Sequence, residues 1–380
     1  LPSKKDVLIY DPLINSSNDL LYYLDNSKIE RLYIRGEKIY IFILIKSLFS
    51  LNFEFKRNYI INYINIVQPK FIISATDNDM VIYTLKEKFL DKIKFIVMQN
   101  GLRGIYDSFE EFRIFKKKTK YKLSVDYFLT ISEPISKKYK KYIKAKYISI
   151  GLFKNNLIKK NKIKYKNRLI FISSFSKNIY ENNFYINNHK YINGNLFFKT
   201  DEIVLKFLYK YCKQKNIDFY ICLRPGNYHE QKKLILDICP SFKNLKFLSN
   251  SNTYDNYREI DKSNFVTCVD SALGYEAYVR GAKVAFFSLK AKSLSINSLK
   301  LGWPAKLKKA DFWTLENKEK EFEKILNYLV NKNKNYRDYR LKYKNRLMSY
   351  DPGNSIFINL LKNNNFPINK KIKNKKRFQI

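Results

Sequence analysis

The first half of the chain alternates short apolar runs with segments of helical period. Most of these runs are continuous, which is typical of strands in a parallel sheet that helices cover on both faces. The predicted strands are Asp6–Tyr10, Arg31–Ile34, Lys70–Ser74, Lys94–Met98, Tyr127–Ile131 and Tyr147–Ile150. The predicted helices are Ser17–Leu24, Tyr40–Leu48, Arg57–Val67, Asn78–Leu90 and Glu133–Ile143. This alternation indicates βαβ units.

The second half repeats the pattern after a Lys- and Asn-rich stretch, residues 151–167, which we interpret as a linker. Its predicted strands are Arg168–Ser173, Phe219–Leu223, Leu245–Leu248, Phe265–Val269 and Val284–Phe287. Its predicted helices are Glu202–Lys215, His229–Ile238, Gly274–Arg280 and Leu315–Lys332. We therefore expect two Rossmann-like domains, residues 1–150 and 168–332, and then a basic helical segment over residues 333–380 that is loose from Ile368.

The composition fits a globular protein with an unusual charge. A hydrophobic fraction of 45% excludes a disordered chain, and the formal net charge is +39. Lys accompanies abundant Asn, Ile and Tyr from end to end, as codon bias would produce, and does not gather in one predicted basic face. We therefore do not expect nucleic acid as the partner, whereas attraction to an anionic membrane or an acidic glycan stays open.

The cysteines and the N-terminus indicate a reducing compartment. The longest apolar run, Ile39 to Leu51, is broken by Lys46 and is too short to span a bilayer, and no signal-peptide pattern precedes it. Inert thiols and no zinc site are expected, because no metal-type spacing joins the four cysteines, Cys212, Cys222, Cys239 and Cys268. These features predict a cytoplasmic protein, with peripheral contact at the inner membrane left open.

The strongest candidate site follows the strand predicted at Phe265–Val269. Asp270 and Ser271 stand where this strand ends and a helix begins. Ligands of open α/β sheets bind outside the carboxyl ends of the strands, and unpaired N–H groups at a helix start favour a phosphate. Simple capping of the helix by Asp270 or Ser271 is the alternative. Capping does not explain Gly274, which would let a ligand approach, or Glu276, whose carboxylate could bind ribose hydroxyls.

A second candidate follows the strand at Lys94–Met98. Gln99, Asn100 and Arg103 would face the acceptor or the acidic group of the donor, since an Arg fork binds both oxygens of a carboxylate. The alternative is a turn closed by glycine. In the second domain, Ser173 and Arg224 also end strands, and either a phosphate contact or a structural role fits them.

Several enzyme classes lose support because their motifs are missing. The sequence contains no Gly-x-Ser-x-Gly, no Gly-x-Gly-x-x-Gly after the first strand and no Walker lysine loop. Hydride transfer, ATP hydrolysis and a Ser–His nucleophile are therefore not expected.

An ordered set of segments resembles bacterial surface-carbohydrate transferases of GT-B fold, including the retaining β-Kdo transferase modules. The central segment is Asp270–Ala277 with Arg280–Phe287. The others are Gln99–Arg103, Ile150–Asn156, Gly302–Pro304, Phe312–Thr314 and Tyr350–Asn354. The resemblance implies two Rossmann-like domains whose parallel sheets face a cleft between them. Ala272 departs from it, because a second hydroxyl is expected there, and Ser173–Ser176 lacks the expected Gln and Arg.

The resemblance also implies a reaction. Such enzymes use CMP-Kdo, need neither a metal nor a further cofactor, and transfer Kdo with retention. Carried over, Asp270 is the carboxylate nucleophile and Ser271 with the helix start holds the phosphate of CMP. Glu276 binds the ribose, and Arg103 or Arg224 meets the Kdo carboxylate.

The leading hypothesis is a transferase that adds Kdo, or a related keto-sugar acid, to a surface polysaccharide such as lipopolysaccharide or capsule, or to its lipid-linked precursor. Two alternatives remain. One is a GT-B transferase or epimerase that uses a UDP- or GDP-sugar. The other is a non-catalytic basic module that binds acidic glycan or membrane.

Overall fold

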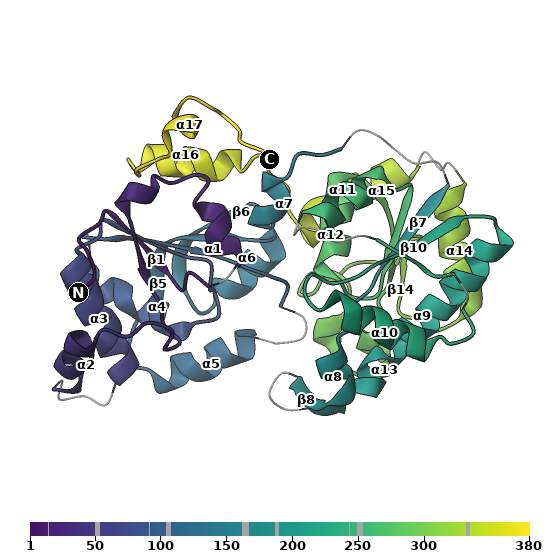
Figure 1. Cartoon of the computed structure of the whole chain (residues 1–380), viewed down its shortest axis with the longest axis horizontal. Coiled ribbons are helices and arrows are strands. Elements are labelled where there is room, and N and C mark those ends of the chain that lie inside the picture. Colours follow the sequence, from purple (N-terminus) through teal and green to yellow (C-terminus); the bar gives the residue numbers. More distant parts are fainter. Residues whose placement is uncertain are drawn as a thin grey trace. The chain divides into compact units, whose positions relative to one another are not determined.

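The computed structural model describes residues 1–13, 15–49, 54–90, 92–103, 108–161, 167–186, 190–242, 244–248, 254–331 and 335–380. The chain forms two compact units (Figure 1). The first comprises Leu1–Gly101, Ser108–Lys159 and Tyr350–Ile380, and the second comprises Leu102–Asp107 and Lys160–Ser349. Within the described ranges, no helix is long and apolar enough to cross a membrane.

The first unit contains a six-stranded parallel sheet in the order β2-β1-β3-β4-β5-β6. Its strands are β1 Val7–Tyr10, β2 Ile29–Leu32, β3 Phe71–Ser74, β4 Lys94–Met98, β5 Ser124–Thr130 and β6 Lys144–Ser149. Its helices are α1 Asn15–Leu20, α2 Ile41–Leu48, α3 Phe55–Val67, α4 Met80–Leu85, α5 Ser108–Lys118, α6 Glu133–Tyr139, α7 Phe153–Leu157, α16 Ser355–Asn363 and α17 Lys370–Lys373. Every predicted strand of this half is present. Helix α5 was not predicted.

The second unit contains another six-stranded parallel sheet, in the order β11-β10-β7-β12-β13-β14. Its strands are β7 Arg168–Ile172, β10 Asp218–Cys222, β11 Lys246–Phe247, β12 Phe265–Cys268, β13 Lys283–Phe287 and β14 Trp313–Thr314. Its helices are α8 Lys177–Glu181, α9 Gly194–Gln214, α10 Tyr228–Ile238, α11 Asp255–Lys262, α12 Ala272–Arg280, α13 Lys290–Ser293, α14 Glu319–Val330 and α15 Asn335–Leu347. An antiparallel hairpin, β8 Asn183–Ile186 with β9 Lys190–Asn193, stands apart from the sheet.

The predicted α/β class with two parallel sheets is confirmed. The short strand β14 and the hairpin were missed, because two or four residues carry too little periodic signal. Helix α9 begins eight residues earlier than the predicted start at Glu202 and covers 21 residues.

The last part of the chain is integrated into the first unit. Figure 1 shows α16 and α17, in yellow, beside the purple N-terminal elements. Phe357, Ile358 and Ile372 are fully buried in one apolar cluster with Ile9 and Phe153. The expectation of a loose stretch from Ile368 is wrong, because these side chains complete the core under β1. Residues 350–380 thus complete the N-terminal unit, whereas the sequence pattern predicts one separate C-terminal segment over residues 333–380.

Candidate functional site

Strand register in the second unit brings three strand ends together. Cys268 of β12 pairs with Ile172 of β7 on one side and with Phe286 of β13 on the other. The residues just beyond these three strands therefore meet at the same edge of the sheet. They include Ser174, Asp270 and Lys290, which are separated in the sequence by up to 116 residues.

Lys290 links these residues in a buried charged cluster. Its Nζ lies 2.8 Å from Asp201 Oδ2, and 3.1 and 3.0 Å from the Oδ1 and Oδ2 atoms of Asp270. It also donates to Ser174 Oγ at 3.3 Å, and Ser174 donates to Asp201 Oδ1. The Lys290 side chain is only 1% exposed. The ring centroid of Phe197 lies 3.9 Å from the Lys290 ammonium. The carboxylates, the serine hydroxyl and the aromatic ring together stabilise the buried positive charge of Lys290.

The cluster holds two carboxylates against one ammonium group. Burial opposes the charge of Lys290, but Asp201 and Asp270 outweigh it and raise the lysine pKa. Burial raises the pKa of Asp201 to about 6, although Lys290 acts in the opposite direction. Asp201 therefore takes up a proton as the pH falls through about 6. Asp270 is the member that reaches solvent, with a 12% exposed side chain.

Asp270 lines a cavity of about 330 Å³. The cavity is formed by residues of the second unit, and its polar and aromatic members are Arg103, Arg224, Asp270, Tyr275, Ser288, Ser298, Lys300 and Trp303. Three of these are cationic and one is anionic. Within the described ranges, no hydrogen bond or ion pair involves the exposed Arg224 guanidinium. Such a cavity suits an anionic ligand.

Capping does not account for Asp270 or Ser271. Ser271 is the N-cap residue of α12, yet its side chain makes no capping hydrogen bond. The Asp270 carboxylate is held by Lys290, as described above. The hydroxyl of Ser271 therefore does not cap α12, and the phosphate contact expected at this helix start stays a prediction.

Gly274 and Glu276 have structural environments that differ from the sequence-based interpretation. A Cβ atom at Gly274 would lie 2.3 Å from Cys268 Sγ, so this glycine lets α12 pack closely on β12. Glu276 is only 4% exposed and accepts a hydrogen bond of 2.8 Å from Tyr257 of α11. It does not line the cavity, so its position gives the expected ribose contact no support.

The residues after β4 separate into two groups. Gln99 is buried and bridges backbone groups, since its Nε2 donates to Gly101 O at 2.8 Å and its Oε1 accepts from Ile131 N at 3.0 Å. The backbone N–H of Asn100 donates to Asp77 Oδ1 at 3.2 Å. These contacts support the structural alternative for Gln99. Arg103, in contrast, lines the Asp270 cavity, and its expected contact with an acidic group stays a prediction.

Two further strand-end predictions also differ in outcome. Ser173 is buried, and its Oγ accepts from Phe175 N at 3.2 Å, which is a turn contact. The neighbouring Ser174 is the serine that joins the charged cluster. Arg224 lines the cavity as a strand-end residue of β10. Its backbone N–H is fixed by Gln231 Oε1 at 3.0 Å.

Sequence reasoning missed Lys290 and Asp201. Lys290 stands three residues after β13, so the strand-end rule could have found it. Asp201 lies inside the long helix α9, and no local pattern distinguishes it from a solvated helical carboxylate. All four cysteines are buried and free, and burial raises the pKa of the Cys222 thiol to about 12. Among the described residues, no group of three or more His, Cys, Asp or Glu side chains could hold a metal ion.

Two parallel-sheet units with this strand-end site define a GT-B-type protein. The chain belongs to the family described as "putative O-antigen biosynthesis protein", whose model matches residues 96–365. No curated protein matches the chain.

Solved structures agree on the fold. A "putative UDP-N-acetylglucosamine 2-epimerase" from Listeria monocytogenes has a TM-score of 0.53 and 10% identity, with 99% of each chain covered. The wall teichoic acid polymerase TagF, in a variant soaked with CDPG, has a TM-score of 0.50 and 14% identity over 95% of this chain and 89% of that one. Identities this low establish the GT-B fold alone.

Proposed function

We propose that the chain is a glycosyltransferase of surface-polysaccharide biosynthesis that binds a nucleotide sugar in the Asp270 cavity. The observation that carries this proposal is the position of Asp270, an accessible carboxylate held at a strand end by a buried lysine. Arg103, Arg224 and Lys300 line the same cavity. They provide positive charge for the phosphate of a donor, next to the start of α12.

The donor that we propose is CMP-Kdo or a related CMP-activated keto-sugar acid. This choice depends on the sequence resemblance described above. It is compatible with the cationic cavity, because the donor carries two anionic groups, the phosphate and the carboxylate of the sugar. Arg224 or Arg103 would bind that carboxylate, while Ser271 and the start of α12 would hold the phosphate. The acceptor would be a glycan or a lipid-linked glycan, and no metal or further cofactor takes part in this scheme.

In the proposed mechanism, Asp270 is the nucleophile. Its carboxylate would form a bond to the anomeric carbon while the bond from that carbon to the phosphate of CMP breaks. The acceptor hydroxyl would then displace the carboxylate and lose its proton, which restores the original configuration. Lys290 would act as a positioning residue, since it contacts both oxygens of Asp270.

Calorimetric titration with CMP, UDP and GDP tests the donor. We expect heat with CMP, and an affinity at least about tenfold weaker in an Arg224→Ala variant, since a charge-assisted pair at this site is lost. An Arg258→Ala variant is the control, because Arg258 lies on α11 and does not line the cavity. Heat with UDP or GDP and none with CMP would overturn the CMP donor and favour a UDP- or GDP-sugar enzyme, including an epimerase such as the structural neighbour.

A further inference from the structure

Helix α2 presents apolar side chains to solvent on most of its surface. Only Ile43 and Ser47 of this helix are buried. Ile41 is 71% exposed and Phe42 is 61% exposed, and Phe49 just after the helix is 82% exposed. The other exposed apolar residues of this surface are Ile39, Leu44, Ile45, Leu48 and Phe55. We call these eight residues the α2 surface. Soluble monomers rarely expose so many large apolar side chains on and around one helix without using them.

The orientation of α2 is fixed by polar contacts on its inner side. Ser47 Oγ donates to Ile43 O at 2.6 Å and accepts from Asn62 Nδ2 of α3 at 3.0 Å. The backbone N–H of Tyr40 donates to Tyr59 Oη at 3.0 Å. Ile43 and Ser47 thus face the protein, while Ile41, Phe42 and Ile45 face outward. An outward face this apolar departs from the usual pattern for a surface helix of a globular protein.

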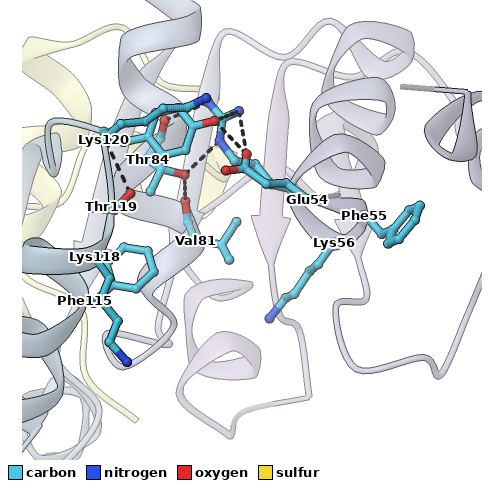
Figure 2. Close-up of a pocket in the computed structure, with 11 residues that line it drawn as sticks. Glu54, Phe55, Lys56, Val81, Thr84, Phe115, Lys118, Thr119 and Lys120 are labelled. Carbon is cyan, nitrogen blue, oxygen red and sulfur yellow. Dashed lines mark hydrogen bonds and ion pairs between the residues drawn. The ribbon is translucent and has the colours of Figure 1, made fainter. Parts of the chain in front are cut away.

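A basic pocket lies where α3 begins. Its volume is about 670 Å³, and its walls come from the start of α3, from α4 and from the end of α5 with the residues that follow (Figure 2). Four cationic residues and one carboxylate line it, namely Lys56, Arg57, Lys118, Lys120 and Glu54. Figure 2 shows Lys56 and Lys118 on either side of the pocket. Phe55 belongs both to this lining and to the α2 surface.

The one carboxylate of the pocket is already engaged. Glu54 Oε2 accepts from Tyr121 Oη at 2.6 Å and lies 3.5 Å from the Arg57 guanidinium. Arg57 itself stacks on the Tyr121 ring, 3.9 Å from its centroid. Lys118 and Lys120 are exposed, and Lys46 projects from α2 among the apolar residues. The region therefore combines outward apolar groups with an excess of positive charge.

We propose that the α2 surface docks on an anionic lipid bilayer. Its apolar side chains would enter the boundary between headgroups and acyl chains, while Lys46, Lys118 and Lys120 would meet lipid phosphates. A second copy of the chain fits less well, because two molecules that each carry a formal charge of +39 repel one another. The docking does not depend on the identity of the nucleotide sugar.

Cosedimentation of the full chain with vesicles tests this proposal. One set of vesicles is pure phosphatidylcholine, and the other is phosphatidylcholine mixed in equal parts with phosphatidylglycerol. We expect the protein to pellet with the mixed vesicles, to bind neutral vesicles more weakly, and to be released partly by salt.

Paired variants identify the surface. Ile41→Ser with Phe42→Ser should lower the partition coefficient about tenfold or more, since two apolar side chains no longer enter the bilayer. Leu196→Ser is the control, because Leu196 is 62% exposed on α9 of the other unit. Lys46→Glu should weaken binding about fivefold or more, and Lys210→Glu on α9 should change it less. Circular dichroism should show each variant folded, since these side chains are exposed.

Three results would overturn the proposal. One is wild-type protein that stays in the supernatant with both kinds of vesicle. Another is vesicle binding that the double serine variant leaves unchanged. The third is a dimer in sedimentation velocity that the double variant dissociates while vesicles are not bound, which would make the α2 surface an interface between copies. Because vesicle binding is measured without donor or acceptor, its failure is distinguishable from a failure of the proposed transferase activity.

Discussion

At the scale of single residues, Lys290 fixes the geometry of the site. It is buried between Asp201 and Asp270, and its contacts with both oxygens of Asp270 fix the direction of that carboxylate. The sequence suggested Asp270 through its place after a strand. It could not suggest the pairing, because a lysine after β13 and an aspartate within α9 meet only when β7, β12 and β13 are adjacent.

Asp270→Asn should lower the rate of sugar transfer by about a thousandfold or more, because an amide cannot form the proposed covalent intermediate. Nucleotide binding should change little, since the positive groups of the cavity remain. The measurement is turnover with a CMP-activated donor, combined with calorimetry of the nucleotide. Asp237→Asn on α10 is the matched control and should behave as wild type. Unchanged turnover in the Asp270 variant would remove its assignment as nucleophile.

Asp201 should make stability depend on pH. Burial raises its pKa from 3.8 to about 6, so the native state binds more protons than the unfolded state in this range. The stability that protonated Asp201 contributes is complete below pH 3.8 and is lost as the pH rises through about 6. The contribution falls by at most about 1.4 kcal/mol per pH unit.

Urea denaturation of wild type and Asp201→Asn across this pH range isolates the effect. The side chain of the variant stays neutral, so the variant should lack this decline in the free energy of unfolding. Equal slopes for the two proteins would show that Asp201 does not titrate in this way.

At the scale of elements, the sequence predicted where helix α12 lies along the chain but not what it contacts. The pattern correctly placed a helix from Gly274 to Arg280, and the structure begins it at Ala272. The sequence suggested Gly274 as space for a ligand, whereas the structure gives this glycine a packing role, because its neighbour is the Cys268 side chain. A helical pattern shows where a glycine stands along the helix, whereas its partner depends on how closely the helix approaches the sheet.

Gly274→Ala should therefore destabilise the second unit by about 1–3 kcal/mol through overpacking. Thermal or urea unfolding provides the measurement. Adding Cys268→Ala removes the sulfur that the new methyl group would meet, so the double variant should be more stable than the sum of the two single changes predicts. Strict additivity of the two changes would argue against this contact as the reason for the glycine.

At the scale of the whole molecule, the chain crosses between its units more than once. Residues 350–380 return to the first unit, where α16 closes the core below the sheet. The sequence indicated helical structure within residues 333–380 but not its partner, because an amphipathic period shows which face is apolar and not which surface will cover it. The same reason explains why the exposed side of α2 was not predicted.

Phe357→Ala should lower the free energy of unfolding of the first unit by about 3–5 kcal/mol, since this side chain is fully buried against Tyr23 and Phe153. Leu341→Ala on α15 is the control, because Leu341 is 58% exposed and should cost little. Limited proteolysis combined with urea unfolding shows which unit is weakened. A loss confined to the second unit would contradict the position of α16.

The alternation of continuous apolar runs with helical segments determined the two parallel sheets, because strand and helix periods are local properties of the chain. The rule that ligands bind at the carboxyl ends of strands also indicated Asp270, Ser271 and Arg224 from the sequence. Only the tertiary structure decided that Lys290 and Asp201 hold Asp270, that Glu276 faces Tyr257, and that α2 presents its apolar side to solvent. Each of these depends on contacts between distant residues, and the local pattern of the chain contains no information about such contacts.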